Sequence, residues 1–272
     1  MQWQAVWGQR LWQVLVTPAI ALLSLGTIAA LQLTSLRDLE QKSQQVLTPA
    51  EYQQEAQQIA LKLKLLQKVP SFGFDNLIAD GVFLQFLQFF GDTKARAQTG
   101  YGLAPNFFEV IIPRDPQFLR AYLFLSVSST IYAGRPDLTV ALMDQGLKSL
   151  SPKAFPDSYT IWVFKANDEL LFLGNYRAAQ KSYQTAAEWV SLQGTPEAKA
   201  TAVSLQRTAT FLKRKPNSKT AQINAWMMVL SNAFDDRTRK LALQNLQRLG
   251  VKITVLPTGK LKFEAPKPDW EY

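Results

Sequence analysis

The sequence predicts an all-α protein in which an N-terminal transmembrane helix precedes a solenoid of paired helices, with a small β-hairpin near the C-terminal end. Three observations predict this fold. Residues 11–33 contain no charged side chain, apolar residues recur at helical spacing from about residue 47 onward, and residues 251–264 alternate between apolar and polar side chains. With 47% hydrophobic and 19% charged residues, the 272-residue chain has the composition of a folded protein.

The chain contains no histidine and no cysteine, and its net charge is +9. Zinc sites of the Cys/His type, disulfides, thiol nucleophiles and His-based catalytic triads are therefore excluded. Two pairs of neighbouring acids remain as candidate catalytic carboxylates. Asp168 and Glu169 fall inside a predicted helix, and Asp235-Asp236 marks a helix start, where carboxylates interact favourably with the helix dipole. We expect a protein that is not an enzyme and that has neither a cofactor nor a metal site.

Residues 1–33 are predicted to form an N-terminal tail and a transmembrane anchor. The uncharged run is long enough to cross a hydrocarbon core of about 30 Å, and Trp3, Trp7 and Trp12 suit the headgroup layer. A cleavable secretory signal is the alternative, with Arg10 as its basic region. The run exceeds the usual apolar length of such signals, which favours an anchor in a plasma or thylakoid membrane. The flanking charges favour a large domain on the periplasmic or lumenal side.

Residues 34–68 are predicted to form an amphipathic stalk helix. Thr48-Pro49-Ala50-Glu51 is typical of a helix start with a capping box, and Val69-Pro70 ends the helix. Residues 69–114 are expected to hold one apolar helix, 75–90, followed by a connecting segment. A second membrane-inserted segment is the alternative for that helix, but its modest length favours burial in the core. The apolar patch 107–112 also requires burial.

Residues 115–250 are predicted to form repeated helix pairs. In the clearest pair, 160–193, Gly174 permits the reversal between the helices and small residues allow close packing: Ala166, Ala179 and Ala186. A shift of 40 residues places Gly134 on Gly174, so a divergent copy precedes this pair and begins with Asp115-Pro116 as N-cap and first helical residue. A third, degenerate pair begins at Thr195-Pro196 and is predicted to cap the stack. A final helix covers 236–249.

The pair at 160–193 resembles the tetratricopeptide repeat. Signature positions of that repeat are occupied by Val163, Ala166, Asn167, Leu170, Ala179, Tyr183 and Ala186, with Asn167 standing where glycine is usual. The order of an N-terminal span, a Phe-rich helix and degenerate repeats resembles membrane-anchored tetratricopeptide-like proteins of bacteria, including cyanobacteria. This resemblance implies an α-solenoid that acts through protein–protein interaction as a scaffold or assembly factor for membrane complexes.

Residues 251–272 are predicted to form a β-hairpin, with a turn at Pro257-Thr258-Gly259, and an exposed tail.

Positive charge is concentrated near the C-terminus, because residues 201–272 contain 13 Lys and Arg but only 5 Asp and Glu. We predict a basic docking surface formed by Lys213, Arg214, Lys215, Lys219, Arg237, Arg239, Lys240 and Arg248. An acidic protein partner and anionic lipid headgroups are both suitable ligands, and a solvated end cap is the alternative. Nucleic acid is not expected as a partner, because no zinc module or recognition helix accompanies the charge.

First helices line the concave face of such stacks, which yields seven candidates for a partner-binding groove: Tyr122, Ser126, Thr130, Trp162, Lys165, Asn167 and Glu169. Packing between helices is the alternative for each. The hypothesised function is that of a non-catalytic, membrane-anchored scaffold that binds a protein partner and assists the assembly or stabilisation of a membrane complex. The alternative is a permanent accessory subunit of a larger membrane complex, such as a photosynthetic one, with helix 77–90 or patch 107–112 buried against its neighbours.

Overall fold

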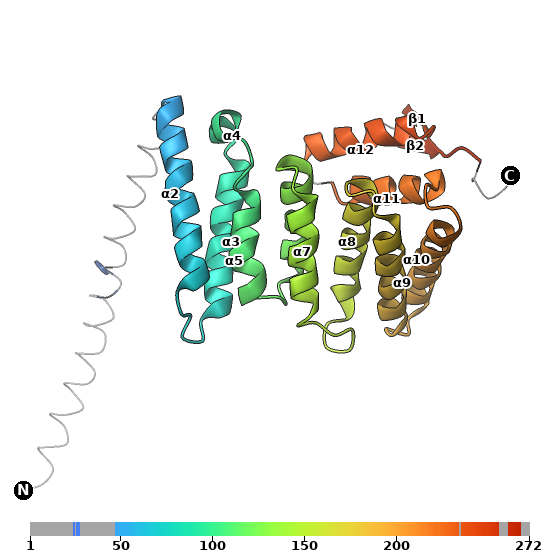
Figure 1. The fold of residues 1–272 in the computed structure, drawn as a ribbon, viewed down its shortest axis with the longest axis horizontal. Coiled ribbons are helices and arrows are strands. Elements are labelled where there is room, and N and C mark those ends of the chain that lie inside the picture. Colours follow the sequence, from blue (N-terminus) through green and yellow to red (C-terminus); the bar gives the residue numbers. More distant parts are fainter. Residues whose placement is uncertain (1–23, 25, 28–46, 234, 256–260, 268–272) are drawn as a thin grey trace, which may run out of the picture. The chain divides into compact units, whose positions relative to one another are not determined.

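The computed structural model describes residues 24, 26–27, 47–233, 235–255 and 261–267 (Figure 1). The chain divides into two compact units, Met1–Glu51 and Tyr52–Tyr272. The predicted anchor at residues 11–33 lies outside the described residues except for Ser24, Gly26 and Thr27. In the part of the chain that is described, no helix combines the length and the apolar character needed to cross a membrane.

Helix α2 (Pro49–Lys68) begins at the predicted capping box. The Thr48 backbone N–H donates to Glu51 Oε2 at 2.7 Å, and the Glu51 N–H donates to Thr48 Oγ1 at 3.4 Å. Further along the helix, Leu63 is fully buried and Ile59 and Leu66 pack against the core of the second unit. One face of α2 therefore belongs to the packed helical body, whereas the sequence predicted a separate stalk.

Helix α3 (Asp75–Gly91) corresponds to the predicted apolar helix. The predicted connection after it contains two further helices, α4 (Thr93–Thr99) and α5 (Ala104–Arg114). The Asp92 side chain accepts a hydrogen bond from the Ala95 N–H at 2.9 Å and starts α4, while Gly100, at φ 68°, ends it. The sequence pattern does not indicate these helices, because α4 is short and α5 contains Pro105 and Pro113.

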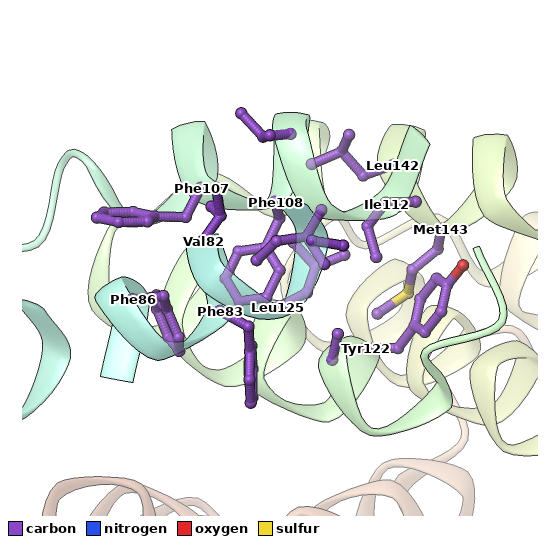
Figure 2. Close-up of a cluster of buried hydrophobic side chains, with 14 of the residues drawn as sticks. Val82, Phe83, Phe86, Phe107, Phe108, Ile112, Tyr122, Leu125, Leu142 and Met143 are labelled. Carbon is purple, nitrogen blue, oxygen red and sulfur yellow. The ribbon is translucent and has the colours of Figure 1, made fainter. Parts of the chain in front are cut away.

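Phenylalanines from α3 and α5 form the centre of a large apolar core (Figure 2). Phe86 and Phe108 are both fully buried, and their ring centroids lie 4.7 Å apart in an edge-to-face arrangement. The patch at 107–112 is buried in the same core, as the sequence predicted. The same core also contains side chains that Figure 2 labels: Val82, Phe83, Phe107, Ile112, Tyr122, Leu125, Leu142 and Met143.

The next helix starts later than predicted. Asp115 ends α5, and its Oδ1 atom accepts the Gln117 N–H at 3.0 Å in a turn, so that α6 (Leu119–Leu125) begins four residues after Asp115. The prediction that Asp115-Pro116 opens the helix is wrong, because the carboxylate closes this turn instead. Helix α6 continues as a π-helix (Ser126–Tyr132), after which α7 (Pro136–Leu147) follows. The spacing of apolar residues does not distinguish a short π-helix from an α-helix.

After a 3₁₀ turn (Pro156–Ser158) come α8 (Tyr159–Leu171), α9 (Tyr176–Ser191), α10 (Pro196–Arg214) and α11 (Lys219–Ser231). Gly134 and Gly174 both adopt positive φ, at 68° and 62°, which supports the 40-residue correspondence between the two turns. Ala166, Ala179 and Ala186 are fully buried at the helix contacts. Within the second unit α3, α5, α7, α8, α9 and α10 pack side by side, while α11 and α12 lie across them (Figure 1).

Helix α12 (Asp236–Arg248) and the antiparallel strands β1 (Lys252–Val255) and β2 (Leu261–Glu264) confirm the predicted final helix and hairpin. Lys252 pairs with Glu264 and Val255 with Leu261. The predicted turn at 257–259 lies outside the described residues. Residues 265–267 of the predicted tail are exposed, and the remainder of the tail is likewise outside the description.

Candidate protein-docking site

Helix α8 carries a row of polar side chains that the helix packing encloses. Lys165, Asn167, Asp168 and Glu169 are each less than a tenth exposed. Burial occurs because α8 is the central helix of this region and contacts α7, α9, α11 and the π-helix. A buried charge is costly unless it is paired, so the partners of this row determine what it can do.

Lys165 and Glu169 form a buried ion pair. The Lys165 Nζ atom donates to Glu169 Oε1 at 2.6 Å and to Ser182 Oγ at 3.2 Å, and Ser182 Oγ donates to Glu169 Oε2 at 2.7 Å. The same ammonium lies 3.4 Å from the half-exposed Asp144 carboxylate of α7. The pair thereby joins α7, α8 and α9.

Asn167 also faces a neighbouring helix and not solvent. Its Oδ1 atom accepts a hydrogen bond from the Tyr183 hydroxyl of α9. Burial raises the pKa of Tyr183 above its ordinary value, and the nearby carboxylates of Asp168 and Glu169 act in the same direction. Tyr183 is therefore neutral and acts as a donor, which explains why asparagine suits the position where the resemblance suggested glycine.

Asp168 faces the π-helix. The Ser126 hydroxyl donates to Asp168 Oδ2 at 3.0 Å, and complete burial raises the pKa of Asp168 from 3.8 to about 8. The hydrogen bond from Ser126 and the nearby hydroxyl of Thr130 oppose this shift, while the charge of Glu169 adds to it. A cavity of about 20 Å³, the size of one water molecule, lies beside the carboxyl group.

The predicted groove residues are therefore enclosed or half-enclosed in the described structure. Tyr122 is fully buried and donates to the Pro116 carbonyl oxygen at 2.9 Å, and Thr130 is 3% exposed. The half-buried Trp162 packs edge-to-face against Trp189 at 5.8 Å. The expectation that these side chains line an open groove requires correction, because Thr130 is buried and the other polar candidates hydrogen-bond to neighbouring helices: Ser126, Lys165, Asn167 and Glu169.

The predicted basic residues fall into two groups. Lys213, Arg214, Lys215 and Lys219 lie at the α10–α11 connection, whereas Arg237, Arg239, Lys240 and Arg248 lie on α12. Arg237 stacks over the Tyr132 ring at 4.3 Å, and Arg239 pairs with Asp236 at 2.8 Å. At about 1.5 Å per residue, α12 separates its first residues from its last by roughly 20 Å. Arg248, at the last residue of α12, directly precedes Leu249 and Gly250, which line the same pocket as Arg214 and Lys219.

Three members of the first group line an open pocket of about 860 Å³. Arg214, Lys215 and Lys219 line it together with Lys267, which follows the hairpin. Apolar contacts come from Pro216, Ile223, Leu249 and Pro266. The pocket thus combines positive charge with an apolar lining, which suits an anionic segment that also carries apolar side chains.

Lys267 and Asp168 were missed by the sequence reasoning. Lys267 is 48 residues from Lys219 along the chain, so only the folded hairpin brings them to one pocket. The sequence places Asp168 inside a predicted helix, and no local signal shows that Ser126, 42 residues earlier, donates a hydrogen bond to it.

A second hollow lies between α9 and α10. It has a volume of about 480 Å³ and an apolar lining that includes Ala187, Ala202, Val203 and Phe211. It carries Glu188 and Arg207, one charge of each sign, so it has no charge preference of the kind that the basic pocket shows. Of the two hollows, the basic pocket therefore has the more specific chemistry.

No family model matches this chain, and neither a curated protein nor a solved structure shows a significant match to it.

Proposed function

We propose that this chain is a non-catalytic adaptor built from tetratricopeptide-like helix pairs, and that it binds an acidic segment of a protein partner in the basic pocket. The observation that carries this proposal is the convergence of four basic residues on one open, partly apolar pocket: Arg214, Lys215, Lys219 and Lys267. The matching positive φ at Gly134 and Gly174 supports the repeat assignment. We further propose residues 11–33 as the membrane anchor, which would place the partner in or near a membrane complex.

A structural use of the buried acids supports a non-catalytic role. Asp168 and Glu169 are 1% and 3% exposed and face side chains of adjoining segments. A catalytic carboxylate must reach its substrate, whereas these two reach only the interior of the helix packing.

The direct test uses the full chain in detergent and measures fluorescence anisotropy of a labelled peptide of alternating Glu and Leu. We expect this peptide to bind more tightly than its Gln/Leu counterpart, with an affinity that falls as salt is raised. Arg214→Ala/Lys267→Ala should weaken binding about tenfold, from two ion pairs of roughly 0.7 kcal/mol each. The matched control is Lys181→Ala/Lys199→Ala, which removes two exposed charges that do not line the pocket.

Equal affinity for the Glu and Gln peptides, or an equal loss in both double variants, would overturn the proposal. The natural partner is then sought by affinity purification of the full chain from gently solubilised native membranes, with mass spectrometry of the associated proteins. A protein retained by the wild type and by Lys181→Ala/Lys199→Ala but lost from Arg214→Ala/Lys267→Ala is a partner of the pocket.

A permanent accessory subunit is the second candidate, and one observation favours it. Leu84 and Leu87 of α3 are 61% and 37% exposed, although Phe83, Phe86 and Phe89 of the same helix are buried. A larger exposed apolar face is typical of a constitutive interface. Stoichiometric recovery of one complex in the purification above would support the subunit, whereas several substoichiometric intermediates would support the adaptor.

A further inference from the structure

The turn between α2 and α3 exposes an unusual amount of apolar surface. Phe72 is 84% exposed, Phe74 63%, Leu77 68% and Val69 47%, and all four fall within nine residues. Leu65, one helical turn before Val69, is 65% exposed and extends the apolar row along α2. Single exposed apolar residues are ordinary, but a cluster that contains two phenylalanines marks a surface that meets an apolar phase or partner.

The backbone of this turn is held firmly while its aromatic side chains extend from it. The Arg114 guanidinium donates to the Val69 carbonyl oxygen at 2.7 Å and to Asp75 Oδ1 at 2.9 Å, and it also donates to the Leu66 carbonyl oxygen. Ser71 Oγ donates to Asp75 Oδ2 at 2.7 Å. Arg114 thus ties the end of α5 to both helices that flank the turn.

Phe72 adopts φ 50°, in the left-handed region that a bulky residue rarely occupies. Glycine at position 72 would relieve this strain, and Gly73 already follows with φ 89°. A phenylalanine held in an unfavourable conformation and exposed to solvent gains nothing within the fold. Such a residue points to a use outside it.

Basic side chains accompany the apolar cluster. Lys64 and Lys68 are exposed on the last turns of α2, and within the part of the chain that the structure describes no carboxylate pairs with them. Asp75, the acid nearest along the chain, is neutralised by Arg114. The α7–α8 connection lies at the same end of the helices as this turn (Figure 1), and it carries two exposed lysines, Lys148 and Lys153, against one exposed acid, Asp157.

We propose that the α2–α3 turn is a membrane-contact site, which inserts Phe72 and Phe74 into the interface of an anionic lipid bilayer while Lys64 and Lys68 meet the headgroups. Aromatic side chains favour the interfacial layer, and basic side chains are attracted to its negative surface potential. A projecting turn suits a lipid surface, whereas a partner protein would be met more specifically by a groove. This inference is separate from the basic pocket and from the proposed anchor.

The test exploits the absence of cysteine from the chain. The full chain carrying Phe72→Cys is labelled with the environment-sensitive dye NBD and reconstituted into nanodiscs made of equal parts of phosphatidylcholine and phosphatidylglycerol. We expect the emission to shift to shorter wavelength and to be quenched by spin-labelled lipid. The matched control is Leu173→Cys, an exposed leucine in the α8–α9 turn at the opposite end of the helices, which should show neither change.

The charge requirement is tested in the same discs. The change Lys64→Gln/Lys68→Gln should reduce the lipid quenching at Phe72→Cys to the level seen in pure phosphatidylcholine, whereas Lys181→Gln/Lys199→Gln should not. Phe74→Cys provides a second labelled site should the first variant fold less well, with helix content checked by circular dichroism.

Lipid quenching that is equal at Phe72→Cys and Leu173→Cys would overturn the proposal. A shift at Phe72→Cys without lipid quenching would also overturn it and would indicate a protein contact instead. Neither outcome affects the peptide measurement on the basic pocket, so failure here is distinguishable from failure of the proposed function.

Discussion

The Lys165 ammonium and the Glu169 carboxylate lie 2.6 Å apart inside the helix packing, with side chains that are 9% and 4% exposed. Such an ion pair differs from the common i,i+4 pair on a helix surface, because both charges have lost most of their hydration. Ser182 completes the arrangement by accepting from Lys165 and donating to Glu169. The pair is therefore a fixed joint between α8 and α9.

The change Lys165→Met should destabilise the fold strongly. It leaves Glu169 buried with Ser182 as its remaining hydrogen-bond partner, and removing one member of a buried pair typically costs about 3–5 kcal/mol. The free energy of unfolding, measured with urea, should fall by about that amount. Lys199→Met, at an exposed position of α10, should change it by less than about 0.5 kcal/mol.

The double change Lys165→Met/Glu169→Met provides the decisive comparison. Because it removes both charges together, stability should return to within about 1 kcal/mol of the wild type. A double variant as unstable as Lys165→Met would show that the loss does not come from an unpaired charge on Glu169.

Two helical glycines should respond in opposite directions to alanine. A Cβ atom at Gly146 in α7 would lie 1.8 Å from the Tyr122 hydroxyl oxygen, and 2.8 Å from the adjoining ring carbon. Gly146→Ala should therefore lower the free energy of unfolding by about 1–3 kcal/mol through overpacking. Gly81 in α3 has open space around it, so Gly81→Ala should raise stability by about 0.5–1 kcal/mol.

Thermal and urea unfolding of the two variants measure this contrast directly. Gly146→Ala combined with Tyr122→Phe should recover part of the loss, since the clashing oxygen is gone while the ring carbons stay. If Gly146→Ala were as stable as the wild type, Tyr122 would have to leave its buried position beside Pro116.

Helix ends were predictable from the sequence because their signals are local. The Thr48–Glu51 capping box depends on side chains three residues apart, and the turn at Gly174 depends on a single backbone conformation. The final helix and hairpin were predictable for the same reason. The predicted helix start at Asp115 was wrong, because a carboxylate before proline can accept a backbone N–H either as a helix cap or in a turn. Here Asp115 accepts the Gln117 N–H in a turn, and the Tyr122 hydroxyl donates to the Pro116 carbonyl oxygen of that turn.

The candidate site was less predictable, because exposure depends on contacts between distant segments. Polar residues on a first helix suggest a groove, yet Lys165 meets Ser182 and Asp168 meets Ser126 only after the helices pack. The basic pocket was half predictable. Its basic residues at the α10–α11 connection are close together in the sequence, whereas Lys267 reaches the pocket only because the hairpin folds back toward that connection.

The raised pKa of Asp168 predicts that the protein loses stability as pH rises. Its pKa is about 8 in the folded protein against 3.8 for the ordinary group, so between these values the folded state holds a proton that the unfolded state has released. Stability contributed by this group is therefore greatest below about pH 4 and falls by up to about 1.4 kcal/mol per pH unit up to about pH 8.

The change Asp168→Asn should remove this part of the pH dependence. The amide stays neutral at every pH, so the variant should unfold with a weaker slope between pH 4 and 8 and should be at least as stable as the wild type at pH 8. Groups close to Asp168 that remain are Ser126, Thr130, Glu169 and Tyr183. An unchanged slope in urea unfolding across this range would show that Asp168 ionises normally in the fold.

Neighbouring acids at the start of α12 should differ sharply in importance. Asp235 accepts the Thr238 N–H at 2.7 Å as the helix N-cap and also accepts the Tyr132 hydroxyl of the π-helix, while Arg237 stacks on the same tyrosine. Asp235→Ala should lower the free energy of unfolding by about 2 kcal/mol, combining the loss of a cap with the loss of a hydrogen bond to a charged group. Asp236, whose side chain is 99% exposed, contacts only Arg239 among the described residues, so Asp236→Ala should cost less than about 0.5 kcal/mol.

Hydrogen exchange locates the effect as well as its size. In Asp235→Ala the amide exchange of α12 should be accelerated relative to the wild type more than that of α3 and α5. The reason is that the cap and the hydrogen bond to Tyr132 hold α12 against the π-helix. Tyr132→Phe should reproduce the part of this acceleration that comes from the tie while preserving the cap. Equal protection of α12 in the Asp235 and Asp236 variants would mean that the apolar contacts of Ala242 and Leu246 with Trp226 hold the helix in place without help from its N-terminus.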